Sequence, residues 1–110
     1  MEKQSPSSTR IEILKRYLSE DPSDTFLRYA LALEYIGIND QKQANVLLEN
    51  LLNEEPDYLA GYYMAGKTSE ALSEIEKAKE WYSRGILVAE HQKNQHTLIE
   101  LNAALEFLKD

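Results

Sequence analysis

Apolar residues recur at intervals of three and four along most of this chain, and short polar, glycine or proline segments interrupt the pattern five times. Spacings of three and four keep apolar side chains on one face of an α-helix. The pattern therefore predicts an all-α fold with about six helices. We expect these helices at residues 9–20, 24–38, 41–54, 58–72, 74–92 and 94–108.

Polar residues at the interruptions predict where the helices begin. A short polar side chain just before a helix can accept a hydrogen bond from an amide of the first turn that has no partner within the helix. We assign this capping role to Thr9, Asp40, Asp57 and Ser73, and we expect the last helix to start at Asn94. The first eight residues are polar and contain the run SPSS, so residues 1–8 are predicted to form a disordered tail.

Composition indicates a single helical domain, which we place at residues 9–109. Apolar residues make up 43% of the 110 residues, and the chain has only four glycines and three prolines. Few glycines and prolines favour helices over a sheet rich in turns. A chain of this length can bury one modest core and is too short for two.

The net charge indicates which partners this protein can bind, and the cysteine content indicates its cellular compartment. The net charge is −7, whereas a protein that binds nucleic acid usually carries a basic surface, so we expect no nucleic-acid partner. The chain has no cysteine, which fits a reducing cytoplasm. No segment approaches the roughly 18 consecutive apolar residues of a membrane-spanning helix, and we expect a cytoplasmic protein with no membrane association.

Candidate catalytic groups are sparse. The only histidines, His91 and His96, are five residues apart and do not share a helix face as a metal-binding pair would. The chain has no glycine-rich phosphate loop, and no spacing suggests a nucleophile with its general base. We therefore expect no metal, no cofactor and no enzymatic activity.

A repeat organises the middle of the chain. Pro22 and Pro56 are 34 residues apart and enclose two apolar-periodic segments that break near Gly37. A helix-turn-helix unit of about 34 residues with the pattern W-x2-L-G-x2-Y, A-x3-F and P is the signature of the tetratricopeptide repeat. Along that pattern the first segment gives Arg28, Leu31, Ala32, Tyr35, Ala44, Leu48 and Pro56, and only the opening aromatic, replaced by Arg28, is lost outright. The second segment gives Tyr62, Ala65, Gly66, Ser69, Ala78, Tyr82 and Glu90.

On these residues the chain resembles the tetratricopeptide repeat family, in particular its small stand-alone bacterial members. The resemblance implies antiparallel helical hairpins stacked as a short right-handed solenoid. Its parts would be a first helix at 9–20, repeat units at 23–56 and 57–90, and a C-terminal capping helix at 94–108. The small residues Ala32, Ala44, Gly66 and Ala78 would let the two helices of each unit approach closely.

The resemblance also implies a binding surface, because the first helix of each unit lines a concave groove in this family. By register, the groove would present Phe26, Tyr29, Leu33, Ile36, Tyr63, Lys67 and Glu70. This set is apolar and tyrosine-bearing, and it lacks the basic cluster with which some members grip acidic chaperone tails. In the alternative interpretation neighbouring helices cover the aromatic side chains, since aromatic residues at helical spacing commonly belong to a core.

Two functional hypotheses follow. The first is a protein–protein interaction module that binds a peptide or a helix of a partner protein in the tyrosine-lined groove. The second is a self-associating assembly subunit, a possible homodimer, that uses Leu98, Leu101 and Phe107 of the last helix, because a short solenoid must cover its ends.

Overall fold

The computed structural model describes residues 6–109, and these residues form six α-helices and no strand. The helices are α1 (Pro6–Glu20), α2 (Thr25–Gly37), α3 (Gln41–Glu54), α4 (Ala60–Ala71), α5 (Ile75–His91) and α6 (Gln95–Leu108). The predicted all-α fold with six helices is confirmed.

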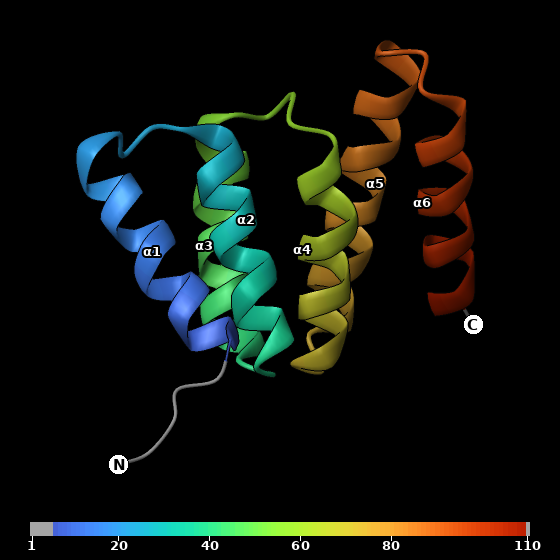
Figure 1. Ribbon diagram of the computed structural model, residues 1–110. Helices are drawn as coiled ribbons and strands as arrows, with labels where there is room; N and C mark the ends of the chain where they lie inside the picture. The colour runs from blue at the N-terminus through green and yellow to red at the C-terminus, as the bar shows by residue number, and fades with distance from the viewer. Residues whose placement is uncertain (1–5, 110) are drawn as a thin grey trace.

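The helices form an elongated stack of antiparallel pairs in chain order (Figure 1). Each helix packs against the next one in the sequence, and α4 also contacts α6. The principal extents are 49 × 28 × 21 Å. Helices α2 and α4 lie on one side of the stack with α3 and α5 behind them, and α6 closes the end. Alternate helices therefore share a face.

Helix starts agree with the sequence pattern at one of the four predicted caps, Asp40, and at the predicted start Asn94. The Asp40 carboxylate accepts a hydrogen bond from Gln43 N at 3.1 Å, and the Asn94 side chain accepts from Thr97 N at 3.0 Å. Asp24, at the edge of a predicted helix, accepts from Leu27 N at 2.9 Å. These caps are polar side chains directly followed by a helix.

The three other predicted caps are wrong. Thr9 lies inside α1, which begins at Pro6, because a proline in the first turn has no N–H that the helix would need to satisfy. The predicted tail is thus helical from residue 6, and residues 1–5 lie outside the described range. Helix α4 begins at Ala60, past Asp57, and its N-cap position has no side-chain hydrogen bond. Ser73 precedes the N-cap residue Glu74.

Ser73 belongs to a recurring turn. Asn39, Ser73 and Lys93 have φ angles of 61°, 61° and 57°, in the left-handed region that normally favours glycine. The residue after each one donates its N–H to the carbonyl five residues back, at 2.8 to 2.9 Å. This bond satisfies a carbonyl at the end of the preceding helix. The same left-handed conformation and the same hydrogen bond therefore end α2, α4 and α5.

Small residues let the helices approach, as the repeat pattern predicts. Ala32, Ala44 and Ala78 are fully buried. A Cβ atom on Gly66 would lie 2.0 Å from Cε1 of Tyr82, and Tyr82 has no exposed surface. The Tyr82 ring of α5 therefore occupies the space that a side chain at Gly66 of α4 would need.

A buried polar cluster joins the two repeat units. Asn45 of α3 is 5% exposed, and its Nδ2 donates to Thr68 Oγ1 at 2.8 Å and to Ser69 Oγ at 3.1 Å on α4. Thr68 Oγ1 in turn donates to the Met64 carbonyl at 3.0 Å. Because buried polar atoms need partners, this cluster fixes the position of α3 against α4.

Candidate functional site

The side of the stack that carries α2, α4 and α6 has two adjoining hollows. The first, about 340 Å³, lies between α4 and α6 and is called the Phe107 hollow; it is lined by Tyr63, Lys67, Glu100, Ala103, Ala104 and Phe107. The second, about 220 Å³, is called the tyrosine hollow; it is lined by Tyr29, Ala60, Tyr63, Met64, Thr97 and Glu100. Tyr63 and Glu100 line both hollows, so the two adjoin each other.

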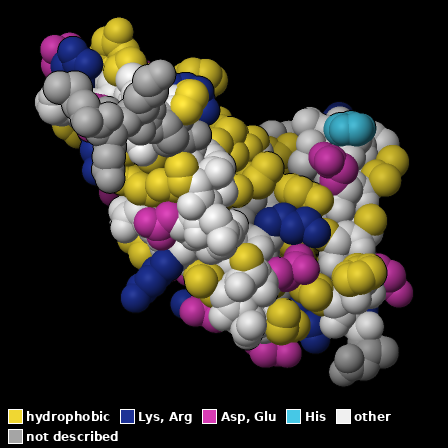
Figure 2. Space-filling view, turned by 60° about the horizontal axis from the view of Figure 1, so that its bottom comes forward, with side chains coloured by type: hydrophobic (Ala, Val, Ile, Leu, Met, Phe, Trp, Pro, Cys, Tyr) yellow, Lys and Arg dark blue, Asp and Glu magenta, His cyan; other side chains and the backbone are white. Residues whose placement is uncertain are grey.

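Hydrophobic side chains gather around this site. Figure 2 shows a broad hydrophobic area on the face turned to the viewer, with basic and acidic side chains set into it. Phe107 is 86% exposed and Phe26 is 71% exposed, which is far more than aromatic residues at helical spacing show in a core. The surface is therefore open at its edges.

The two tyrosines that line the hollows are held by other rings. Tyr29 and Tyr58 are in edge contact with ring centroids 5.3 Å apart, and Tyr63 and Tyr82 are 6.2 Å apart. Burial raises the pKa of Tyr29, and the neighbouring Tyr58 raises it further. The Tyr29 phenol is therefore neutral over the physiological range of pH, and its ring is anchored to the fold.

Lys67, which lines the Phe107 hollow, forms an ion pair with Glu70. Lys67 Nζ lies 3.7 Å from a Glu70 carboxylate oxygen and 5.4 Å from the centroid of the Tyr63 ring. The Tyr82 hydroxyl donates a hydrogen bond to the same Glu70 carboxylate. Burial and this bond raise the pKa of Tyr82 well above its usual value. The charge of Lys67 is thus compensated, and Glu70 acts as a structural acceptor.

The predicted groove residues divide into three groups. Tyr29, Tyr63 and Lys67 line the hollows. Phe26 and Leu33 are exposed on α2 without lining either hollow. Ile36 is half-buried on α2, and Glu70 is paired with Lys67.

The wall that α6 contributes was missed from the sequence. It consists of Thr97, Glu100, Ala103, Ala104 and Phe107. One further period of 34 residues after Tyr63 and Glu70 gives Thr97 and Ala104, so extending the repeat into the last helix could have found this wall. Helix α6 lies beside the groove and does not close it.

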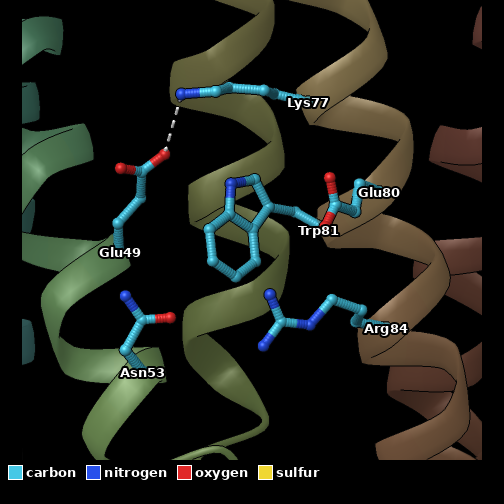
Figure 3. Close-up of a pocket in the computed structure, with 6 residues that line it drawn as sticks. All are labelled: Glu49, Asn53, Lys77, Glu80, Trp81 and Arg84. Carbon is cyan, nitrogen blue, oxygen red and sulfur yellow. Dashed lines mark ion pairs between the residues drawn. The ribbon is translucent and has the colours of Figure 1, made fainter.

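The opposite side has a hollow of a different character (Figure 3). It measures about 220 Å³, lies between α3 and α5, and is lined by Glu49, Asn53, Lys77, Glu80, Trp81 and Arg84. Lys77 forms an ion pair with Glu49 at 3.6 Å, and the Arg84 guanidinium lies 4.6 Å from the Trp81 ring centroid. Trp81 is only 7% exposed. This hollow therefore offers little apolar surface to a partner.

Residues 6–109 were compared with the requirements of a metal site and of a membrane span. No three or more His, Cys, Asp and Glu side chains in that range are arranged to hold a metal ion. None of the helices in the described part of the chain combines the length and the apolar character needed to cross a membrane.

Comparison with known proteins finds tetratricopeptide repeat proteins both by sequence and by structure. No family model matches the chain. A TPR repeat-containing protein of Pseudomonas aeruginosa is 27% identical over 79 residues, which cover 72% of this chain and 75% of that protein. The solution structure of a tetratricopeptide repeat domain protein from Salinibacter ruber is 38% identical, covers 80% of this chain and 89% of its own, and has a TM-score of 0.75.

A more distant structure agrees in fold. The solution structure of a Bordetella parapertussis protein is 23% identical, with 96% of this chain and 89% of that chain covered and a TM-score of 0.79. At this identity the likeness concerns the arrangement of helices alone.

Proposed function

Because this chain belongs to the tetratricopeptide repeat family, we propose that it is a non-catalytic interaction module that binds a peptide or a helix of a partner protein on the face of α2, α4 and α6. The observation that carries the proposal is the pair of adjoining hollows that share Tyr63 and Glu100. Continuous concave surfaces suit an extended or helical segment better than they suit a small molecule.

The chemistry of the surface supports this role. Aromatic residues held in place by the fold lose little conformational entropy on binding and often dominate interface energies. Tyr29 and Tyr63 are anchored in this way, while Phe26, Leu33 and Phe107 supply exposed apolar area around them.

The remaining members of the proposed site are Ile36, Lys67 and Glu70. In this proposal Ile36 extends the apolar flank on α2. Glu70 holds the Lys67 ammonium at 3.7 Å and so keeps the lysine stem along one side of the Phe107 hollow.

The test is capture of partner proteins by the wild-type chain and by a Tyr63→Ala, Phe107→Ala variant, followed by mass spectrometry. Leu87→Ala is the control, because Leu87 is 68% exposed on α5 and lines neither hollow. We expect the double variant to lose the captured partners and the control to keep them, with helicity unchanged in both. Retention of the same partners by a folded double variant would contradict the proposal.

Self-association is the second candidate, and exposed apolar residues on α6 favour it. Phe107 and Ile99 are 86% and 60% exposed. Leu101, which we expected to join such an interface, is fully buried, and Leu98 packs against the core. Sedimentation velocity would detect dimers of the wild-type chain that disappear with Phe107→Ser, and a monomer at all concentrations would rule this candidate out.

A further inference from the structure

The charges around the tyrosine hollow are unbalanced. Lys67, the one basic residue lining either hollow, is paired with Glu70 at 3.7 Å. Glu100, which lines both hollows, lies 3.8 Å from His96, a side chain that is charged only when it is protonated. No Lys or Arg of the described range forms an ion pair with Glu100. Its carboxylate, 47% exposed, therefore presents negative charge to the site.

Two tyrosine rings and this carboxylate line the same small hollow. The negative face of an aromatic ring attracts a Lys ammonium or an Arg guanidinium, and a carboxylate adds a charge-assisted hydrogen bond. No basic side chain lines the tyrosine hollow itself; the Lys67 ammonium, 5.4 Å from the Tyr63 ring centroid, lines the adjoining hollow and is paired with Glu70. The net charge of −7 on the whole chain also attracts a cationic segment. The hollow is therefore complementary to a cation.

The adjoining Phe107 hollow suits an apolar side chain. Ala103 and Ala104 leave room beside the exposed Phe107 ring and the half-buried Tyr63 ring. Because both hollows share Tyr63 and Glu100, their occupants must be close together in space. One turn of helix or two residues of extended chain would place two side chains in adjoining hollows.

We propose that this face recognises a segment carrying a Lys or Arg side chain, bound between Tyr29, Tyr63 and Glu100, and a bulky apolar side chain within four residues, bound beside Phe107. This rests on the proposed function and names the chemistry of its partner. Acidic or uncharged segments bind weakly, because Glu100 repels an acid and stays unpaired against a neutral residue.

The test starts from a random peptide library displayed on phage and selected on the full chain. We expect the selected peptides to share a basic and an apolar residue within four positions. One selected peptide is then titrated by fluorescence anisotropy against Glu100→Gln, Glu100→Lys and Glu106→Lys. Glu106 is the matched control, because it lies on the same helix, is 78% exposed and lines neither hollow.

For the basic peptide, Glu100→Gln should weaken binding about fivefold and Glu100→Lys at least about tenfold, as for a half-exposed ion pair. Glu106→Lys should change binding less than about twofold, since only long-range charge differs. A peptide whose basic residue is replaced by glutamate should bind Glu100→Lys better than it binds the wild type. Such a reversal of charge specificity would identify Glu100 as the residue that contacts the charged side chain of the peptide.

Failures of the two proposals are distinguishable. Selected peptides that bind Tyr63→Ala, Phe107→Ala as well as the wild type lie elsewhere on the protein and overturn the proposed function. Peptides that need Tyr63 and Phe107 but are acidic, or that bind all Glu100 variants equally, leave the groove intact and overturn only the recognition of a cation. Circular dichroism of each variant confirms that the helices are intact before titration.

Discussion

Gly66→Ala tests the close approach of α4 and α5. The new Cβ atom would lie 2.0, 2.4 and 2.6 Å from three atoms of the Tyr82 ring, whereas carbon atoms in contact are about 3.5 to 4.0 Å apart. The ring would therefore have to move by roughly 1.5 Å. It has no exposed surface, its hydroxyl is bonded to Glu70, and Tyr63 lies beside it, so it has no free space to enter.

Two opposing effects determine how much Gly66→Ala changes the free energy of unfolding. Overpacking a core typically destabilises by about 1 to 3 kcal/mol and sometimes more, and a fully enclosed ring belongs at the upper end. Replacing glycine by alanine inside a helix stabilises by about 1 kcal/mol. The net expectation is a loss of about 2 kcal/mol in the free energy of unfolding, measured by urea denaturation with circular dichroism at constant slope.

A glycine without such a neighbour is the control. Gly37 is exposed at the end of α2 and has no positive φ, so Gly37→Ala should leave stability unchanged or raise it slightly. In a Tyr82→Leu background, Gly66→Ala should lose most of its effect because the ring is gone. If Gly66→Ala stabilises as Gly37→Ala does, or if its effect is equal in both backgrounds, the steric reasoning is refuted.

Three further predictions concern polar groups. Asn45→Asp places a carboxylate opposite the Thr68 hydroxyl, which already donates elsewhere, and should destabilise by about 2 to 4 kcal/mol at pH 7 and less at low pH, in urea titrations against the wild type. The pKa of Tyr82 is higher in the folded than in the unfolded state, so the free energy of unfolding is at its full value below about pH 10 and decreases above it. In Tyr82→Phe the free energy of unfolding should decrease less above this pH. Asp40→Ala should lower the free energy of unfolding by about 1 kcal/mol, because Asp40 caps α3. Asp57→Ala should have a much smaller effect, because Asp57 caps no helix. Similar losses in both variants would contradict the observed starts of α3 and α4.

The helices were predictable because their information is local. Apolar spacing identified all six, and the small residues of the repeat identified where helices meet, as at Gly66 and Ala78. Helix starts were less predictable. A polar residue near a start can lie inside the helix, as Thr9 does, or in the left-handed turn before it, as Ser73 does. Several polar residues compete for one position, and tertiary packing decides among them.

The candidate binding face was only half predictable. Register placed Tyr29, Tyr63 and Lys67 on one side, but the contribution of α6 depends on how that helix packs against both α4 and α5. Ala103 and Phe107 recur at helical spacing, which fits an additional neighbouring helix and a partner equally well. The periodicity of α6 alone could not decide between a neighbouring helix and a partner protein, because the other wall of the Phe107 hollow comes from α4, more than thirty residues earlier.

The position of α6 at the end of the stack also links binding to local unfolding. Among the described helices, α6 packs chiefly on α5 and to a smaller extent on α4. In linear repeat arrays such ends open before the centre does. Any fraction of molecules with α6 detached lacks Glu100 and Phe107, so the apparent dissociation constant rises by the inverse of the closed fraction. A ligand held between α4 and α6 should in turn slow amide exchange along α6, and one end of the solenoid would thus report occupancy of the site.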